Sequence, residues 1–146
     1  MSNTEDIKKT ILIVEDELIN LEMLANVIQA DYKILKAENG KDALKIIEDP
    51  DNRLSLVLLD LNLPDMNGKD ILREMHEKDL LDKIPVVVLT ADKDSEVESL
   101  DLGASDFIQK PYPKAEVIQA RVRRTIELSE RRIIIGEAER DNLTGL

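Results

Sequence analysis

The stretch that decides the fold is Leu56-Val57-Leu58-Leu59-Asp60-Leu61-Asn62-Leu63-Pro64-Asp65-Met66-Asn67-Gly68. Its first four residues are apolar, a carboxylate ends the run at Asp60, and a loop with Pro and Gly follows. A continuous apolar run of this kind is typical of a strand buried on both faces, as in a parallel sheet covered by helices. Because the chemistry of such sheets takes place beyond the C-terminal ends of the strands, Asp60 is predicted to lie at a functional edge.

Five apolar runs alternate with helical patterns along the chain. The predicted strands span residues 10–15, 32–37, 54–60, 84–90 and 106–110. Apolar residues at helical spacing separate the strands: Leu21, Leu24, Ala25 and Ile28, then Ala43, Ile46 and Ile47, then Ile71, Leu72 and Met75, and more weakly Val97 and Leu100. This alternation predicts right-handed βαβ units in a three-layer α/β domain. We expect a flavodoxin-like, doubly wound sheet of five parallel strands in the order 2-1-3-4-5.

A fifth helix is predicted to begin near Pro113 and to run on without Pro to Glu139-Arg140, with Gly136 as its one weak point. Two imperfect heptad registers run along it, one through Val122, Ile126, Ser129, Ile133 and Gly136, the other through Leu128 and Ile135. A dimeric or interdomain helix is favoured over a solvated helix that frays. The predicted divisions are a tail at 1–9, a domain at 10–125, a signalling or linker helix at 126–140 and a further segment at 141–146.

The composition excludes several classes of site. The formal net charge of −11 argues against binding of a nucleic-acid backbone, and an aromatic content of 2% leaves no platform for stacking bases. The chain has no Cys, so it has no disulfide, thiol nucleophile or zinc-thiolate site. No apolar stretch is long enough to span a bilayer and no signal-peptide pattern begins the chain, so we expect no membrane association and a cytoplasmic location.

Carboxylates follow two strands that are neighbours in the predicted order. Glu15 and Asp16 end the first apolar run, and Asp60 ends the third. Three converging carboxylates repel one another unless a cation neutralises them, and an oxygen-only ligand set favours Mg²⁺. Taken singly, Asp60 is also explained as a cap of the following turn, and Glu15-Asp16-Glu17 as negative charge at a helix N-terminus. Their pairing at adjacent strand ends favours the metal site.

Two other strand ends carry polar side chains that suit the same chemistry. Thr90-Ala91 ends the fourth run, where a hydroxyl can donate a hydrogen bond. Lys110-Pro111 ends the fifth, where the ammonium is either a salt-bridge partner of the carboxylates or a clamp for phosphoryl oxygens. A carboxylate nucleophile, a divalent cation, a hydroxyl and an ammonium together are the groups that phosphoryl transfer requires.

These motifs resemble the receiver domain of bacterial two-component response regulators over about residues 8–126. The matching segments are Ile13-Val14-Glu15-Asp16-Glu17, Leu58-Leu59-Asp60-Leu61-Asn62-Leu63-Pro64, Met66-Asn67-Gly68, Leu89-Thr90-Ala91, Gly103-Ala104-Ser105-Asp106-Phe107 and Lys110-Pro111. The resemblance implies a signalling module that takes a phosphoryl group from a histidine kinase or a phosphotransfer protein. It does not imply an enzyme that turns over a substrate.

The resemblance also implies a role for each matched residue. Asp60 is the phosphoacceptor, and Asp16 binds Mg²⁺ directly. Glu15 binds the metal directly or through water, and Asn62 offers it a backbone carbonyl. Lys110 and Thr90 contact the phosphoryl oxygens. Thr90 and Phe107 form the switch, in which Phe107 lacks the hydroxyl of the Tyr often found in the family. The Lys110-Pro111 peptide bond is typically cis in the family.

The end of the chain carries a second resemblance. Asp141-Asn142-Leu143-Thr144-Gly145-Leu146 is similar to the opening of the GGDEF domain of diguanylate cyclases, although a helix end capped by Gly145 gives the same pattern. We therefore expect a C-terminal effector domain in the same polypeptide, a diguanylate cyclase, and a homodimer on activation.

Three rival interpretations remain open. Haloacid-dehalogenase-like phosphatases also use an Asp, a Thr or Ser and a Lys, but their general acid is a second Asp where this chain has Asn62. A flavodoxin-like binding module needs a phosphate loop after the first strand, where Glu15-Asp16-Glu17 would repel the anion. A receiver-like interaction module that is never phosphorylated is the third. His76, the one histidine, is read as a surface residue.

Overall fold

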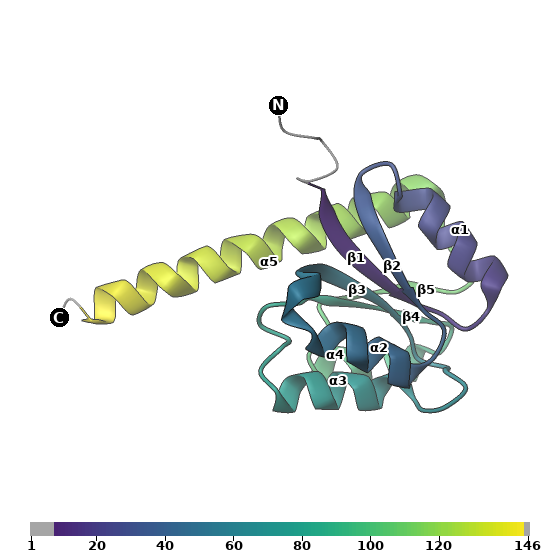
Figure 1. Cartoon of the computed structure of the whole chain (residues 1–146), viewed down its shortest axis with the longest axis horizontal. Coiled ribbons are helices and arrows are strands. Elements are labelled where there is room, and N and C mark those ends of the chain that lie inside the picture. The colour runs from purple at the N-terminus through teal and green to yellow at the C-terminus, as the bar shows by residue number, and fades with distance from the viewer. Residues whose placement is uncertain (1–7, 145–146) are drawn as a thin grey trace.

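The computed structural model describes residues 8–144, and the side chains of residues 8–134. Strands and helices alternate along the chain (Figure 1). The strands are β1 (Lys9–Val14), β2 (Tyr32–Ala37), β3 (Leu54–Asp60), β4 (Val86–Thr90) and β5 (Asp106–Gln109). The helices are α1 (Leu18–Ile28), α2 (Gly40–Glu48), the short 3-10 helix η2 (Pro50–Asn52), α3 (Gly68–Glu77), α4 (Lys93–Asp101) and α5 (Ala115–Thr144). Across the described residues, no helix combines the length and the apolar character that crossing a membrane requires.

The predicted sheet is confirmed. All neighbouring strands are parallel and lie in the order β2-β1-β3-β4-β5. The register places Val14 of β1 beside Leu59 of β3, and Asp60 beside Leu89 of β4. The C-terminal ends of β1, β3 and β4 therefore meet at one edge of the sheet. Three strands differ from the predicted ones by one or two residues: β1 is shifted one residue towards the N-terminus, β4 begins after Pro85, and β5 ends before Lys110.

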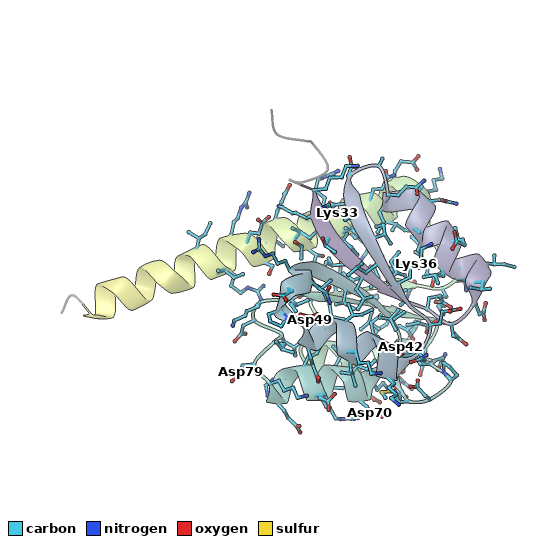
Figure 2. All side chains as sticks on the ribbon, in the orientation of Figure 1. Lys33, Lys36, Asp42, Asp49, Asp70 and Asp79 are labelled. Atoms are coloured by element: carbon cyan, nitrogen blue, oxygen red, sulfur yellow. The ribbon has the colours of Figure 1, made fainter. Side chains whose placement is uncertain are left out.

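The strand that decided the fold is buried on both of its faces, as its sequence predicted. Leu56 and Leu58 pack against α1 and α5, whereas Val57 and Leu59 pack against α2 and α3. All four side chains are fully buried. Charged side chains gather on the outside of these layers; Figure 2 labels six exposed ones, Lys33, Lys36, Asp42, Asp49, Asp70 and Asp79.

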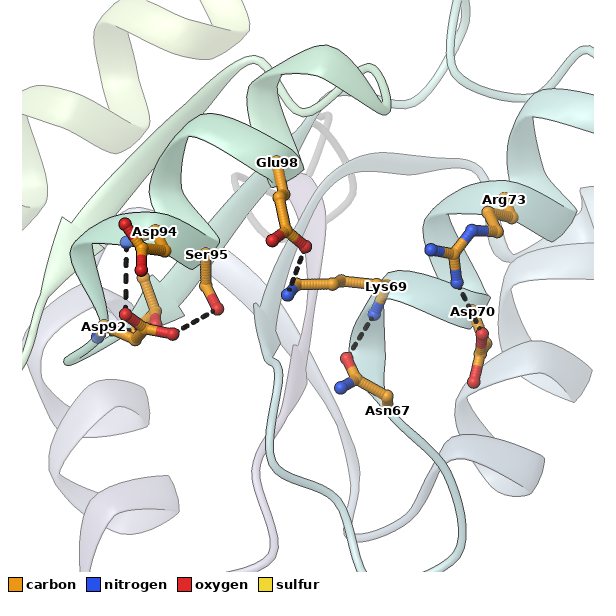
Figure 3. A network of polar contacts seen from close by, with 9 residues as sticks. Asn67, Lys69, Asp70, Arg73, Asp92, Asp94, Ser95 and Glu98 are labelled. Carbon is orange, nitrogen blue, oxygen red and sulfur yellow. Dashed lines mark hydrogen bonds and ion pairs between the residues drawn. The ribbon is translucent and has the colours of Figure 1, made fainter.

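Helix α4 forms where the weak sequence pattern indicated a helix, but the two apolar residues of that pattern are exposed. Val97 and Leu100 are 61% and 42% exposed, and α4 turns Ser95 and Ser99 inwards instead. Polar contacts link α4 to its neighbours: the Glu98 carboxylate lies 2.7 Å from the Lys69 ammonium of α3 (Figure 3), and Glu96 accepts a hydrogen bond from the Gln109 side chain of β5. With only two apolar side chains among nine residues, α4 has no continuous apolar stripe to turn towards the core.

Helix α5 extends well past the sheet (Figure 1), as expected, but the first two residues of one predicted heptad register are not available to a partner. Val122 and Ile126 are buried in the core against β1, β3 and α1. They face the sheet because the first turns of α5 supply the second helix that covers this face. The exposed large apolar side chains between residues 115 and 134 are Val117, Leu128, Ile133 and Ile134. The side chain of Ile135 lies outside the described ones.

Candidate functional site

Three carboxylates converge at the edge where β1 and β3 end. Glu15 and Asp16 follow β1 directly, and Asp60 is the last residue of β3. One oxygen from each of the three lies within 4.8 Å of the others. Glu15 and Asp60 are buried, whereas Asp16 is exposed, so the cluster opens to solvent on one side. The parallel register between β1 and β3 produces this convergence, because it brings residues 45 positions apart in the chain to adjacent strand ends.

The chemistry of these groups fits a hard divalent cation. The three ligand atoms are carboxylate oxygens, which Mg²⁺ and Ca²⁺ prefer to nitrogen or sulfur. Mg²⁺ keeps several of its waters and needs few protein ligands, so an open cluster of three acids suits it. The residues present therefore fit the metal that the sequence indicated.

Lys110 supplies the positive charge of the site. Its ammonium lies 2.7 Å from Oδ2 of Asp60 and 3.8 Å from Oε2 of Glu15. Lys110 follows β5, and its amide donates to the carbonyl of Thr90, which holds the residue beside β4. The Lys110-Pro111 peptide bond is cis, as expected. One ammonium thus partly neutralises two buried carboxylates, and the cluster keeps an excess of negative charge.

The surroundings of Glu15 disfavour the ionised form of its carboxyl group. Burial, together with the hydrogen bond and the charge of Asp60, raises the pKa of Glu15 to about 7, although Lys110 opposes the change. The Glu17 amide donates to Oε1 of Glu15 at 3.2 Å. A carboxylate whose ionised form is disfavoured gains most from a nearby cation, since the cation removes the repulsion from Asp60.

Asp60 is held by its own loop as well as by Lys110. The amide of Asn62 donates to Oδ1 of Asp60 at 2.9 Å, and the amide of Gly68 donates to the carbonyl of Leu61 at 2.9 Å. A Cβ at Gly68 would lie 2.7 Å from the carbonyl oxygen of Asp60, so only glycine allows α3 to begin this close to the strand end. The local sequence after β3 therefore fixes the carboxylate's orientation.

The two predicted switch residues lie outside this cluster. Thr90 is buried at the end of β4, and its hydroxyl accepts a hydrogen bond from the Asp92 amide at 3.1 Å. Asp92 in turn caps α4, because its carboxylate accepts from the Asp94 amide and the Ser95 hydroxyl (Figure 3). Phe107, half-buried on β5, packs against the core on the α2 and α3 side. The structure links Thr90 to the start of α4 and does not bring it into contact with Asp60 among the described hydrogen bonds.

Tyr112 is a member of the site that the sequence reasoning missed. Its hydroxyl donates to Oε2 of Glu15 at 3.5 Å, and its ring centroid lies 6.0 Å from the Lys110 ammonium. Burial, followed by the charge of Glu15, raises the pKa of Tyr112, so its hydroxyl stays protonated as a donor. Its position two residues after Lys110, in the same loop, was the available signal. His76 is exposed on α3, as predicted.

Comparisons with known proteins agree with this geometry. Residues 11–123 match the response regulator receiver domain family. The chain belongs to the response regulator receiver domain family. The phosphate regulon transcriptional regulatory protein PhoB of Pseudomonas aeruginosa is 38% identical over 123 residues, covering 80% of this chain and 53% of that protein. The alkaline phosphatase synthesis transcriptional regulatory protein PhoP of Bacillus subtilis is 33% identical over 141 residues, covering 94% and 56%.

A solved receiver domain shares the fold as well. The beryllofluoride-activated receiver domain of DrrB from Thermotoga maritima superimposes with a TM-score of 0.72 at 28% identity, covering 83% of this chain and 99% of that domain. The chain spans about half the length of PhoB and PhoP. The receiver assignment therefore covers the chain from β1 into α5, whereas the activity of any longer protein is a separate question.

Proposed function

We propose that the chain receives a phosphoryl group on Asp60 from a histidine kinase or a phosphotransfer protein and so controls an output domain. The observation that carries the proposal is the buried Asp60 carboxylate beside Lys110, at the open cluster with Glu15 and Asp16. In the transfer, an oxygen of Asp60 forms a bond to phosphorus while the bond from phosphorus to the donor histidine nitrogen breaks. The leaving imidazole keeps the electron pair.

Each residue of the site has a role in this proposal. Glu15, Asp16, Asp60 and the backbone carbonyl of Asn62 would hold Mg²⁺. Bound there, the cation would neutralise the carboxylates and the transferred phosphoryl oxygens. Lys110 already contacts Asp60, and it would remain beside the new phosphoryl oxygens as a charge-assisted donor.

Thr90 and Phe107 are proposed to report the modification to the surface. Thr90 would turn its hydroxyl towards the phosphoryl group, and Phe107 would fill the space vacated. Because the Thr90 hydroxyl also accepts from Asp92, the cap of α4, its movement would loosen the start of that helix. Hydrogen exchange with and without beryllofluoride should then differ across residues 91–110. Differences confined to the surroundings of Asp60 would contradict the switch.

Phosphorylation is tested by intact mass after incubation with acetyl phosphate. We expect one added phosphoryl group with Mg²⁺, none with EDTA and none in Asp60→Asn. The exposed Asp82→Asn serves as the matched control, because it removes a carboxylate away from β3 and should label like the wild type. Full labelling of Asp60→Asn would remove the basis of the proposal. Turnover of a generic phosphomonoester would instead favour a phosphatase, which the exposed amide of Asn62 disfavours because it cannot act as a general acid.

The output domain is proposed to be a diguanylate cyclase. The support is the similarity of residues 141–146 to the opening of a GGDEF domain. Residues 145 and 146 lie outside the described residues, and α5 continues through residue 144. The curated relatives PhoB and PhoP are transcriptional regulatory proteins, so a DNA-binding output is the alternative. The sequence that follows Leu146 in the reading frame distinguishes the two.

We also propose that α5 beyond Thr125 pairs two copies on activation. Leu128, Ile133 and Ile134 are 43%, 37% and 65% exposed on a segment that leaves the domain. Light scattering on the chain and on its truncation at residue 125, each with and without beryllofluoride, tests the pairing. A dimer that strengthens with beryllofluoride and is lost on truncation is expected. Monomers under all four conditions would exclude this role in the fragment.

A further inference from the structure

The loop between β3 and α3 is fastened to a helix that takes no part in the carboxylate cluster. Oδ1 of Asp65 accepts a hydrogen bond from the amide of Gly40 at 2.7 Å, and Oδ2 accepts one from the amide of Lys41 at 2.9 Å. Both amides belong to the first turn of α2, where backbone donors have no partner within the helix. Asp65 is exposed, yet these hydrogen bonds lower its pKa, with Gly40 the larger cause.

A second contact, between Met66 and Gly40, also joins the loop to α2. Met66 lies against Gly40 so closely that a Cβ at residue 40 would come within 2.4 Å of Cγ of Met66. Gly40 is buried by this contact. The tip of the loop is thus attached to α2 twice, once by a carboxylate and once by a side chain that occupies the place of the missing Cβ.

The opposite end of the loop is attached to Asp60. The amide of Asn62 donates to Oδ1 of Asp60, Asn62 forms an isolated antiparallel bridge with Asn67, and the amide of Gly68 donates to the carbonyl of Leu61. These contacts close the base of the loop. The closed loop connects Asp65 at its tip to the backbone of Asn62 at its base.

We propose that Asp65 is a positioning residue, which holds the backbone carbonyl of Asn62 in place for the metal by anchoring the loop to α2. The inference rests on the proposed function, in which that carbonyl is a metal ligand. Side chains that orient the groups bound to a metal contribute to its affinity, and their loss typically costs about 10- to 100-fold. A residue that only capped α2 would affect the stability of the fold and leave the affinity for Mg²⁺ unchanged.

The chain offers a matched control on the same helix. Asn39 caps α2 from its own side, because its side-chain oxygen accepts from the Asp42 amide at 2.8 Å. The Asn39 side-chain amide also donates to Oδ2 of Asp42 at 3.0 Å. Asn39→Ala therefore removes two hydrogen bonds from the same turn of α2 and none from the loop after β3. Asp65→Ala removes both hydrogen bonds to Gly40 and Lys41, and Asp65→Asn keeps one acceptor oxygen.

The experiment is a calorimetric titration of Mg²⁺ into the wild type and the three variants, with thermal unfolding of each. We expect the dissociation constant to rise about tenfold in Asp65→Ala, by less in Asp65→Asn, and not at all in Asn39→Ala. If Asp65→Ala does not fold, the comparison of the Mg²⁺ dissociation constants of Asp65→Asn and Asn39→Ala tests the role of Asp65. Equal affinities in all four proteins would overturn the role of Asp65 and leave the proposed function standing. Absence of Mg²⁺ binding in the wild type would overturn both.

Discussion

Replacement of Glu15 by Gln should stabilise the metal-free protein at alkaline pH and not at acidic pH. The pKa of Glu15 is raised from 4.5 to about 7, chiefly by burial and by Asp60. At about 1.4 kcal/mol per pKa unit, this displacement means that ionised Glu15 costs the folded state about 3 kcal/mol. Gln has nearly the shape of the protonated acid and carries no charge, so it avoids that cost.

The sign of the effect follows from proton binding. The folded protein holds the Glu15 proton more tightly than the unfolded chain, so wild-type stability falls as the pH rises from 4.5 to about 7 and then levels off. The difference between Glu15→Gln and the wild type should therefore be near zero at about pH 4.5 and about 3 kcal/mol at about pH 8. Mg²⁺ should reduce this stability difference, because the wild type binds the cation in its folded state and is stabilised by it.

The assay is urea unfolding in EDTA and in Mg²⁺ at these two pH values. Glu17→Gln is the control, since it removes an equal charge two residues away from an exposed position. It should leave the pH dependence unchanged. If Glu15→Gln is stabilised equally at both pH values, or is less stable than the wild type in EDTA at about pH 8, the carboxylates do not repel one another as the structure indicates.

Three further changes test other parts of the molecule. Lys110→Ala should lower the free energy of unfolding by about 3 kcal/mol at neutral pH, because it leaves Asp60 buried without its ion pair; a urea titration that shows no loss would contradict this. Ser99→Ala should raise the thermal midpoint and increase the free energy of unfolding by about 1 kcal/mol, because the buried Ser99 hydroxyl has no hydrogen-bond partner among the described residues. A decrease would contradict this and indicate that a bound water satisfies the hydroxyl. The double change Val97→Ser and Leu100→Ser should lower the free energy of unfolding by less than about 1 kcal/mol, since the two side chains are 61% and 42% exposed. A larger loss in calorimetry would contradict this.

Much of the fold could be predicted because the sequence of β3 indicates that both faces of the strand are buried. Leu56, Val57, Leu58 and Leu59 are apolar on both faces of the strand, which only a sheet covered by helices on both sides can bury. The orientation of helix α4 on the sheet could not be predicted in the same way. Val97 and Leu100 are its only apolar residues, yet both are exposed, and the side of the helix that faces inwards carries Ser95 and Ser99.

The same contrast holds for the site. Asp60, Glu15 and Asp16 could be named in advance, because parallel strands place their C-terminal ends together and each of these residues ends or follows a strand. Tyr112 and Asp65 could not, since their partners Glu15 and Gly40 are 97 and 25 positions away in the chain. Nothing in the local sequence of a loop specifies which distant backbone or side chain it will contact.

Hydrophobic periodicity and the residues at strand ends were sufficient for the layer architecture and for the acidic cluster, because burial of apolar side chains is non-directional and repeats along each element. The orientation of α4, the burial of Val122 and Ile126 by the domain itself, and the anchoring of the β3–α3 loop by Asp65 depended on the tertiary structure. Hydrogen bonds are short-ranged and directional. Their partners are therefore known only once the elements have been packed against one another.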